Sequence, residues 1–124
     1  MKKTESYLPK RLSPEKVMVV ASKIWQNQRS VAADVSTRAS KIIQTAYEKK
    51  PTFFSGKSEK GILSGLFYHL GSNVGSMKTQ QEVALALGTT EMTTRASCRV
   101  WLKHFPELLS GRTKSASENY NRSG

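Results

Sequence analysis

"TQQEVALALGTTEMTTRASCRVWLKHF", residues 79–105, contains two helical runs separated by one glycine. The first run opens with Thr79 and Glu82, at the spacing of a capping box, in which each side chain accepts a backbone N–H of the other residue. Gly88 ends this run as a candidate left-handed cap, because glycine adopts positive φ at no steric cost. The stretch therefore predicts two helices joined by a tight turn.

The second run, which Thr89 or Thr90 could cap, carries two different faces, since residues three or four apart share one side of a helix. One face is expected to point inward and consists of Thr94, Cys98, Trp101 and Phe105. The other begins near the helix N-terminus and is largely basic: Met92, Arg95, Arg99 and Lys103. Such a face suits a helix laid in the major groove of DNA. It is also typical of the solvated face of an ordinary amphipathic helix.

Ala84 and Gly88 fit a helix-turn-helix, in which a small residue lets the two helices cross and glycine makes the turn. Many helical hairpins share this spacing, so it does not by itself indicate DNA binding. Cys98 is expected to be a small buried residue. Trp25 and Trp101 are expected to pack in the core.

The composition favours a nucleic-acid partner. Twenty Lys and Arg against nine Asp and Glu give the 124-residue chain, the size of one domain, a net charge of +11. Nucleic acid and anionic membranes are the usual partners of such a surface, although solubility alone is an alternative explanation. No apolar run approaches the roughly 20 residues that span a bilayer, so no membrane partner is expected. No apolar signal-peptide core follows the basic N-terminus, which predicts an intracellular protein.

The sequence predicts neither catalysis, nor a metal site, nor a cofactor. Cys98 is the single cysteine, so a cysteine-based zinc site is excluded. His69 and His104 are far apart and have no nearby carboxylate pattern. The glycines of residues 71–76 lack the Lys-Ser/Thr pair of a phosphate-binding loop, and no nucleophile has an identifiable base.

Apolar residues at helical spacing predict three further helices upstream, at residues 13–26, 34–50 and 58–73. Ser13 is the expected N-cap of the first, and Asp34 or Ser36 that of the second. The third is the most apolar and is expected at the centre of the fold. Its Gly61 and Gly65 either admit a neighbouring helix closely or merely weaken the helix.

A single domain is therefore expected over residues 13–108, after a lead segment at residues 1–12. A disordered polar tail is expected at residues 109–124. Phe53 and Phe54 lie in a predicted loop and are expected to pack against the core.

The final stretch resembles the C-terminal cyclin-like repeat of transcription factor IIB and its archaeal counterpart, transcription factor B. The matching residues are Thr79, Gln80, Glu82, Val83, Gly88, Glu91, Met92, Thr93, Arg95 and Arg99. Upstream, "KGILSGLFYHLGS" is similar to the third helix of that repeat, with Phe67-Tyr68 in place of its Ile/Leu-Tyr pattern. The resemblance covers about residues 7–110. Two inward positions depart from the family, which prefers Ile or Val at Thr94 and Tyr at Cys98.

This resemblance implies an all-α, five-helix cyclin-like domain with a helix-turn-helix at residues 79–105. It implies binding of promoter DNA upstream of the TATA element, together with the TATA-binding protein and with RNA polymerase as a further candidate partner. Met92 is then expected to make an apolar base contact and Arg95 to hydrogen-bond a base. Three residues are candidate phosphate contacts. Two of them, Arg99 and Lys103, follow from helix geometry, and the third is Thr79.

The compartment implied is the cytoplasm for an archaeal protein and the nucleus for a eukaryotic one. The chain has no zinc ribbon or first cyclin repeat, so it is either an excised domain or a short relative. Two other functions stay open, a helix-turn-helix regulator unrelated to initiation and a cyclin-fold adaptor that binds only protein. An enzyme is not supported by any constellation of residues.

Overall fold

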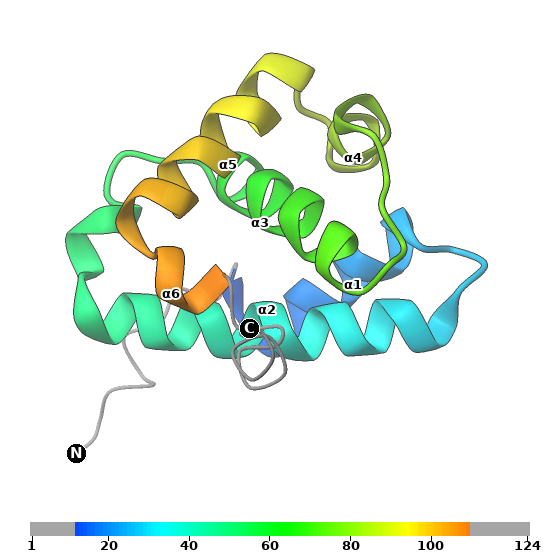
Figure 1. The fold of residues 1–124 in the computed structure, drawn as a ribbon, viewed down its shortest axis with the longest axis horizontal. Helices are drawn as coiled ribbons and strands as arrows, with labels where there is room; N and C mark the ends of the chain where they lie inside the picture. The colour runs from blue at the N-terminus through cyan, green and yellow to red at the C-terminus, as the bar shows by residue number, and fades with distance from the viewer. Residues whose placement is uncertain (1–11, 110–124) are drawn as a thin grey trace, which may run out of the picture.

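The computed structural model describes residues 12–109, and every regular element in that range is helical (Figure 1). The elements are α1 (Pro14–Ile24), α2 (Arg29–Lys49), the 3-10 helix η3 (Pro51–Phe54), α3 (Glu59–Asn73), α4 (Gln80–Leu87), α5 (Glu91–His104) and α6 (Pro106–Leu109). The prediction of an all-α fold is confirmed for this part of the chain.

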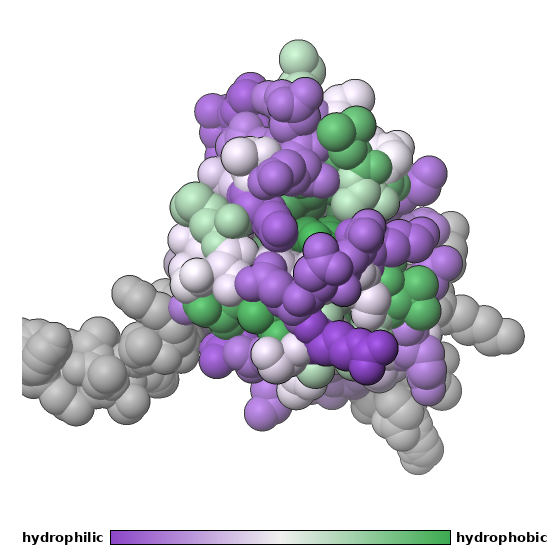
Figure 2. Space-filling model, turned by 90° about the vertical axis from the view of Figure 1, so that its right-hand side faces the viewer, coloured by the Kyte–Doolittle hydropathy of each residue, from purple (hydrophilic) through white to green (hydrophobic). Residues whose placement is uncertain are grey.

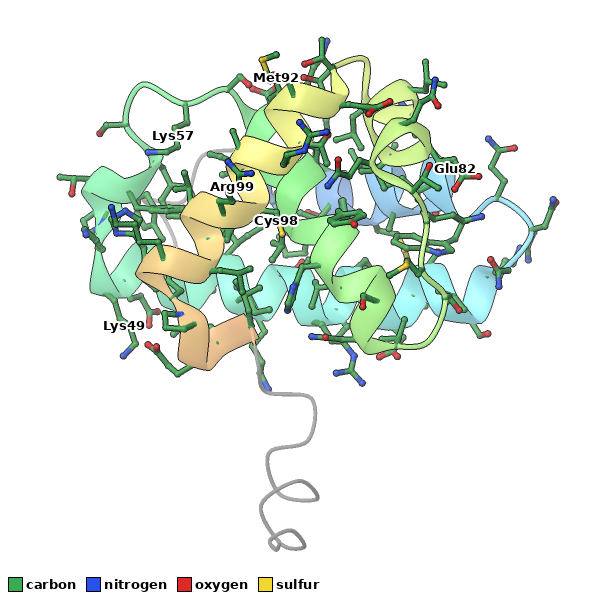
Figure 3. All side chains as sticks on the ribbon, turned by 45° about the horizontal axis from the view of Figure 1, so that its top comes forward. Lys49, Lys57, Glu82, Met92, Cys98 and Arg99 are labelled. Atoms are coloured by element: carbon green, nitrogen blue, oxygen red, sulfur yellow. The ribbon has the colours of Figure 1, made fainter. Side chains whose placement is uncertain are left out.

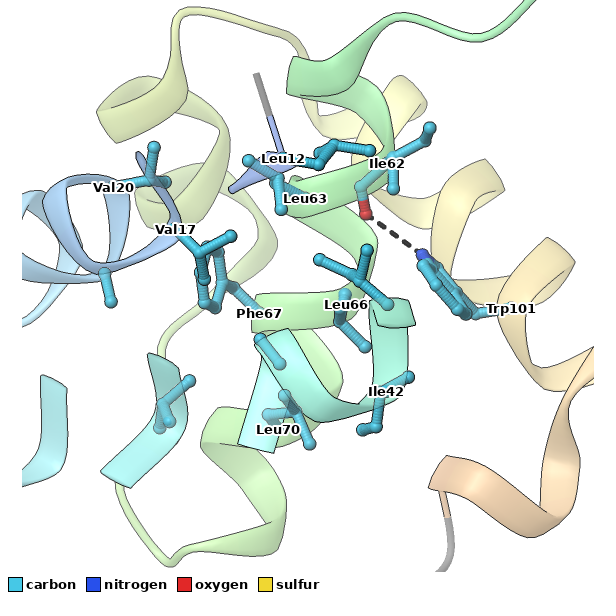
Figure 4. Packing of buried hydrophobic residues seen from close by; sticks show 14 of the residues in the cluster. Leu12, Val17, Val20, Ile42, Ile62, Leu63, Leu66, Phe67, Leu70 and Trp101 are labelled. Carbon is cyan, nitrogen blue, oxygen red and sulfur yellow. Dashed lines mark hydrogen bonds between the residues drawn. The ribbon is translucent and has the colours of Figure 1, made fainter. Parts of the chain in front are cut away.

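Helix α3 is the element around which the others pack. It contacts α2, α4 and α5, and it crosses the middle of the molecule in Figure 1. A helix enclosed by others has to be apolar on most of its circumference. The apolar side chains of α3 are buried in the core shown in Figure 4: Ile62, Leu63, Leu66, Phe67 and Leu70. Its predicted central position is therefore confirmed.

Helix α5 approaches α3 most closely at Gly65. A β-carbon added to Gly65 would lie 2.3 Å from Ser97 Oγ and 2.5 Å from the backbone nitrogen of Cys98. Both distances are far shorter than a van der Waals contact, so only glycine allows the two helices to pack at this separation. Of the two alternatives left open for Gly65, the structure supports close approach of a neighbouring helix.

The first helix begins as predicted. The Ser13 hydroxyl accepts a hydrogen bond of 3.3 Å from the Lys16 N–H, and Pro14 occupies the first turn. Trp25 follows the helix and is 1 % exposed, and its indole N–H donates to the Ser76 carbonyl over 3.0 Å. Trp25 is thus a core residue, as expected, and it ties the end of α1 to the segment after α3.

The second helix begins earlier than predicted. It starts at Arg29, and its N-cap, Gln28, makes no side-chain hydrogen bond. Both predicted caps lie inside the helix: Asp34 pairs with Arg38 over 3.0 Å, and Ser36 Oγ donates to a carbonyl of the preceding turn. Burial of apolar side chains in the additional turns, rather than a capping residue, stabilises this start.

The predicted loop after α2 contains the short helix η3. Its Phe53 and Phe54 are buried, as expected. The Phe53 ring lies 4.8 Å from that of Trp101 and 5.0 Å from that of Phe105, measured between centroids. This aromatic cluster joins η3 to the C-terminal half of α5.

One residue of the predicted polar tail belongs to the packed domain. Leu109 lies in α6 and is fully buried. Its carbonyl accepts hydrogen bonds from Asn73 Nδ2 over 2.9 Å and from His69 Nε2 over 3.1 Å. The remainder of the predicted tail and the predicted lead segment before Leu12 lie outside the described residues.

Candidate nucleic-acid interface

The start of α4 is fixed by the predicted capping box. The Thr79 hydroxyl accepts the Glu82 N–H over 3.0 Å, and the Glu82 carboxylate accepts the Thr79 N–H over 2.8 Å. This backbone hydrogen bond is the main reason why the pKa of Glu82 lies below its usual value. Desolvation raises this pKa, whereas the charge of Lys78 and the hydrogen bond from the Thr79 side chain lower it further.

The capping box limits what Thr79 can do as a phosphate contact. Its N–H is already donated to an ionised carboxylate, and that carboxylate would repel a phosphate brought to the same point. Only the hydroxyl hydrogen of Thr79 remains as a donor. The proposed role of Thr79 stays a prediction, restricted to that one atom.

The turn between α4 and α5 is short and has the conformation that glycine favours. Gly88 has φ of 75° and ψ of 35°, in the left-handed region. Of the two candidate caps for α5, the structure selects Thr90, whose hydroxyl accepts the Thr93 N–H over 3.1 Å. Figure 1 shows α4 almost end-on while α5 runs obliquely across the molecule, so the two helices cross steeply.

The predicted inward face of α5 is largely confirmed. Thr94, Trp101 and Phe105 are buried. Cys98 is only partly buried, because it lies at the edge of the contact with α3. Burial raises the pKa of its thiol above the ordinary value, which favours the neutral, unreactive form.

The outward face of α5 is exposed along its whole length. It consists of the four predicted side chains Met92, Arg95, Arg99 and Lys103. Met92 is 73 % exposed. In Figure 3, Met92 and Arg99 extend from α5 away from the body of the molecule, whereas Cys98 lies toward α3.

Few interactions within the protein hold the basic side chains of this face. Arg95 forms a long ion pair of 3.9 Å with Glu91, in which both side chains are about half exposed. An exposed pair of this kind contributes at most about 1 kcal/mol, so an external acceptor can displace it. Within residues 12–109, Arg99 and Lys103 form no ion pair.

An open groove of about 500 Å³ separates α4 from the first turns of α5. The groove is lined by Leu85 of α4, which is 72 % exposed, and by Met92 of α5, which is 73 % exposed. Arg95 and Gln81 add polar groups to the same groove. Two exposed apolar side chains and an arginine therefore line one open groove.

Sequence reasoning missed a group of cations at the other end of α5. Lys50, the C-cap of α2, places its Nζ 3.0 Å from Nδ1 of His104. Lys57, in the loop before α3, donates to the Phe53 carbonyl over 2.7 Å, and its Nζ lies 4.9 Å from the centre of the Phe53 ring. We call Lys50, Lys57 and Lys103 the lysine cluster. No local pattern joins residues so far apart in the sequence.

The lysine cluster affects the charge state of His104. Partial desolvation lowers the pKa of this imidazole below its ordinary value of 6.5, and the charges of Lys50, Lys103 and Lys57 lower it further. An ammonium group has only donors, so the hydrogen bond requires Nδ1 of His104 to be an unprotonated acceptor. His104 is therefore neutral at physiological pH.

The described residues contain neither a candidate metal site nor a helix that could cross a membrane. Between residues 12 and 109, no group of three or more His, Cys, Asp or Glu side chains could hold a metal ion. None of the helices in that range combines the length and the apolar character needed to cross a membrane.

The face shown in Figure 2 is largely hydrophilic, with hydrophobic side chains in small separate patches.

No protein family, curated protein or solved structure was found to match the chain. The resemblance to the transcription factor IIB family therefore depends on the residues quoted for it.

Proposed function

We propose that the chain binds duplex DNA, with α4 and α5 acting as a helix-turn-helix whose second helix enters the major groove. The observation that carries this proposal is the division of α5 into two faces. Its inner face is packed on α3, and its outer face presents Met92, Arg95, Arg99 and Lys103 to solvent. A helix buried on one side and basic on the other can enter the groove without unfolding the domain.

The spacing along α5 matches the dimensions of the groove. A helix rises about 1.5 Å per residue, so Arg95 and Lys103 are about 12 Å apart along the axis. The major groove of B-DNA is also about 12 Å wide. With Met92 and Arg95 over the base edges, Lys103 reaches the phosphates that border the groove, and Arg99 lies between them. Arg95 can then donate two hydrogen bonds to a guanine, and Met92 can contact a thymine methyl group.

The net charge of +11 supports the same function. Binding that neutralises phosphates releases condensed counterions, which favours association at low salt. The exposed side chains of Arg99 and Lys103 have no internal partner to give up among the described residues. Their contribution to affinity is therefore not reduced by the loss of an ion pair.

The resemblance to the C-terminal repeat of transcription factor IIB extends the proposal to promoter DNA. In this extension, α5 reads the element upstream of TATA, and the domain acts beside the TATA-binding protein, with RNA polymerase as a further partner. Gly88 and the exposed Arg95 support this extension, since both are among the residues that carry the resemblance.

A second candidate function is protein binding alone, by a cyclin-fold adaptor. Leu85 and Met92 favour it, because a pair of exposed apolar side chains on a groove is also typical of a peptide-docking surface. The adaptor and the DNA-binding protein differ in their response to salt and to duplex DNA.

The test is a fluorescence-anisotropy titration of the full chain on a labelled TATA-containing duplex, at two or more salt concentrations and with or without TATA-binding protein. We expect weak binding by the domain alone, with log affinity falling against log salt by about 0.9 for each phosphate contacted. We also expect tighter binding when TATA-binding protein is present.

No affinity for duplex DNA at low salt would leave the protein-only adaptor as the better account. Binding to a palindromic duplex as a dimer, with no effect of TATA-binding protein, would instead indicate a regulator unrelated to initiation. Sedimentation velocity of the complex distinguishes a bound dimer from a bound monomer.

A further inference from the structure

Two members of the lysine cluster, Lys50 and Lys57, are held by contacts within the protein. Lys50 is fixed by its hydrogen bond of 3.0 Å to His104. Lys57 is fixed by a hydrogen bond of 2.7 Å to the Phe53 carbonyl and by the face of the Phe53 ring. The His104 ring lies 5.5 Å from the same Phe53 ring. Lys57 and the neutral His104 therefore meet at one aromatic side chain, and Lys50 is joined to them through His104.

This arrangement has an electrostatic cost in the free protein. Desolvation is the main cause of the lowered pKa of His104. The positive charges of Lys50, Lys103 and Lys57 lower it further, so all three ammonium groups act on the same imidazole. Like charges in such proximity repel one another. An anion placed among them would remove the repulsion and gain an attraction from each.

Helix dipoles account for only part of the cluster. Lys50 and Lys103 lie at the C-terminal ends of α2 and α5, where positive charge is favourable. Lys57 does not, because it directly precedes Ser58, the N-cap of α3, and the N-terminal end of a helix disfavours a cation. The Lys57 ammonium group instead hydrogen-bonds the Phe53 carbonyl at the end of η3, so this lysine is held by η3 and not by the dipole of α3.

We propose that Lys50 and Lys57 join Lys103 in a phosphate-binding site that holds the DNA backbone at the C-terminal end of α5. The inference rests on the proposed DNA-binding function and adds residues from α2 and from the loop before α3. Lys103 belongs to both surfaces, since it ends the outward face of α5 and borders His104. A backbone that leaves the groove at Lys103 meets Lys50 and Lys57 next.

The experiment compares the Lys50→Gln/Lys57→Gln variant with a Lys49→Gln variant, each as the full chain. Lys49 adjoins Lys50 and is exposed, but its charge is not among those that act on His104. In Figure 3 its side chain points away from Lys57. We expect the double variant to lower the slope of log affinity against log salt by about 1.8, or about 0.9 for each lost phosphate contact. Lys49→Gln should leave the slope unchanged, and circular dichroism confirms that each variant is folded.

A second readout uses His104 itself, by NMR titration of its imidazole in the free chain and in the complex. A phosphate beside the imidazole favours the protonated form, so the pKa of His104 should rise on DNA binding. Suppose that the wild type binds DNA. If the double variant then shows the wild-type salt slope, or if the pKa of His104 is the same in the free and bound wild type, the inference is overturned and the DNA-binding function stands. Absence of any DNA binding by the wild type would overturn both.

Discussion

The indole N–H of Trp101 donates a hydrogen bond of 3.0 Å to the backbone carbonyl of Ile62, as the dashed line in Figure 4 shows. Trp101 is fully buried, and its ring also lies 6.1 Å from that of Phe54. The periodicity of α5 correctly predicts burial of this tryptophan. Its hydrogen-bond and ring partners come from α3, from η3 and from Phe105 at the end of α5. The exposed face of α5 is therefore oriented chiefly by α3.

Trp101→Ala should destabilise the protein by about 3–5 kcal/mol, the range for truncation of a large aromatic side chain in a core. Trp101→Phe loses the hydrogen bond to Ile62, worth about 1 kcal/mol, and leaves a smaller cavity than alanine does, so it should cost less than Trp101→Ala. Urea unfolding of both variants measures these differences. A wild-type unfolding midpoint for Trp101→Ala would contradict the burial of this residue.

Gly65→Ala should also destabilise the domain, by about 1–3 kcal/mol or more, because an added methyl group overlaps the backbone of α5. Gly61→Ala is the matched control in the same helix. Its β-carbon would lie 3.0 Å from Ser58 Oγ and 3.3 Å from Thr93 Cγ2, and both are side-chain atoms that can shift. The higher helix propensity of alanine, worth up to about 1 kcal/mol, offsets that contact.

Thermal melts of the two glycine variants provide the comparison. The account requires Gly65→Ala to melt clearly below Gly61→Ala. Equal melting temperatures would show that the contact between α3 and α5 at Ser97 can widen without cost. Close approach of α5 would then no longer explain the glycine.

The sequence was most informative where a local pattern determines the backbone. The cap at Ser13, the capping box of Thr79 and Glu82, and the left-handed Gly88 are short-range motifs, and all three are confirmed. Apolar spacing also identifies the buried side of α5. By contrast, the start of α2 at Arg29 has no side-chain cap and hence no local signal, and the caps predicted for it, Asp34 or Ser36, lie inside the helix.

Features that depend on tertiary contact could not be predicted. Periodicity shows that Trp101 points inward, but not that Ile62 accepts its hydrogen bond. The lysine cluster brings together Lys50 and His104, which are 54 residues apart in the sequence. Of the proposed site, the exposed face of α5 follows from spacing, whereas Lys50 and Lys57 become visible only once the chain is folded.

Acidification should weaken the fold through His104. Because the folded-state pKa of His104 lies below the ordinary value of 6.5, the unfolded chain binds this proton more readily. The free energy of unfolding should therefore fall as the pH is lowered from about 6.5 through the folded pKa. Above about pH 6.5, His104 is neutral in both states and should not reduce the free energy of unfolding. His104→Gln lacks this component. Unfolding curves at several pH values measure it, and equal pH dependence of wild type and variant would contradict it.

Arg95 should determine sequence discrimination, and Lys103 only affinity. Once a preferred duplex has been selected, Arg95→Ala should cost about 1–3 kcal/mol on it and much less on a scrambled duplex. Lys103→Ala should weaken both complexes alike and lower the salt slope by about one. Four affinities, each variant on each duplex, are needed. An equal loss on both duplexes for Arg95→Ala would mean that α5 does not read bases.

The central claim, that the outward face of α5 binds duplex DNA, is tested most directly by two charge-matched triple variants. One is Arg95→Gln/Arg99→Gln/Lys103→Gln, and the other changes three exposed cations of α1 and α2: Lys23→Gln, Arg29→Gln and Lys41→Gln. Each removes three positive charges from a net charge of +11. For the α5 variant, we predict that the slope of log affinity against log salt falls by up to about 2.7, or about 0.9 per lost contact. The control should stay close to wild type, and equal losses in the two variants would contradict the claim, because they would show that affinity follows net charge and not α5.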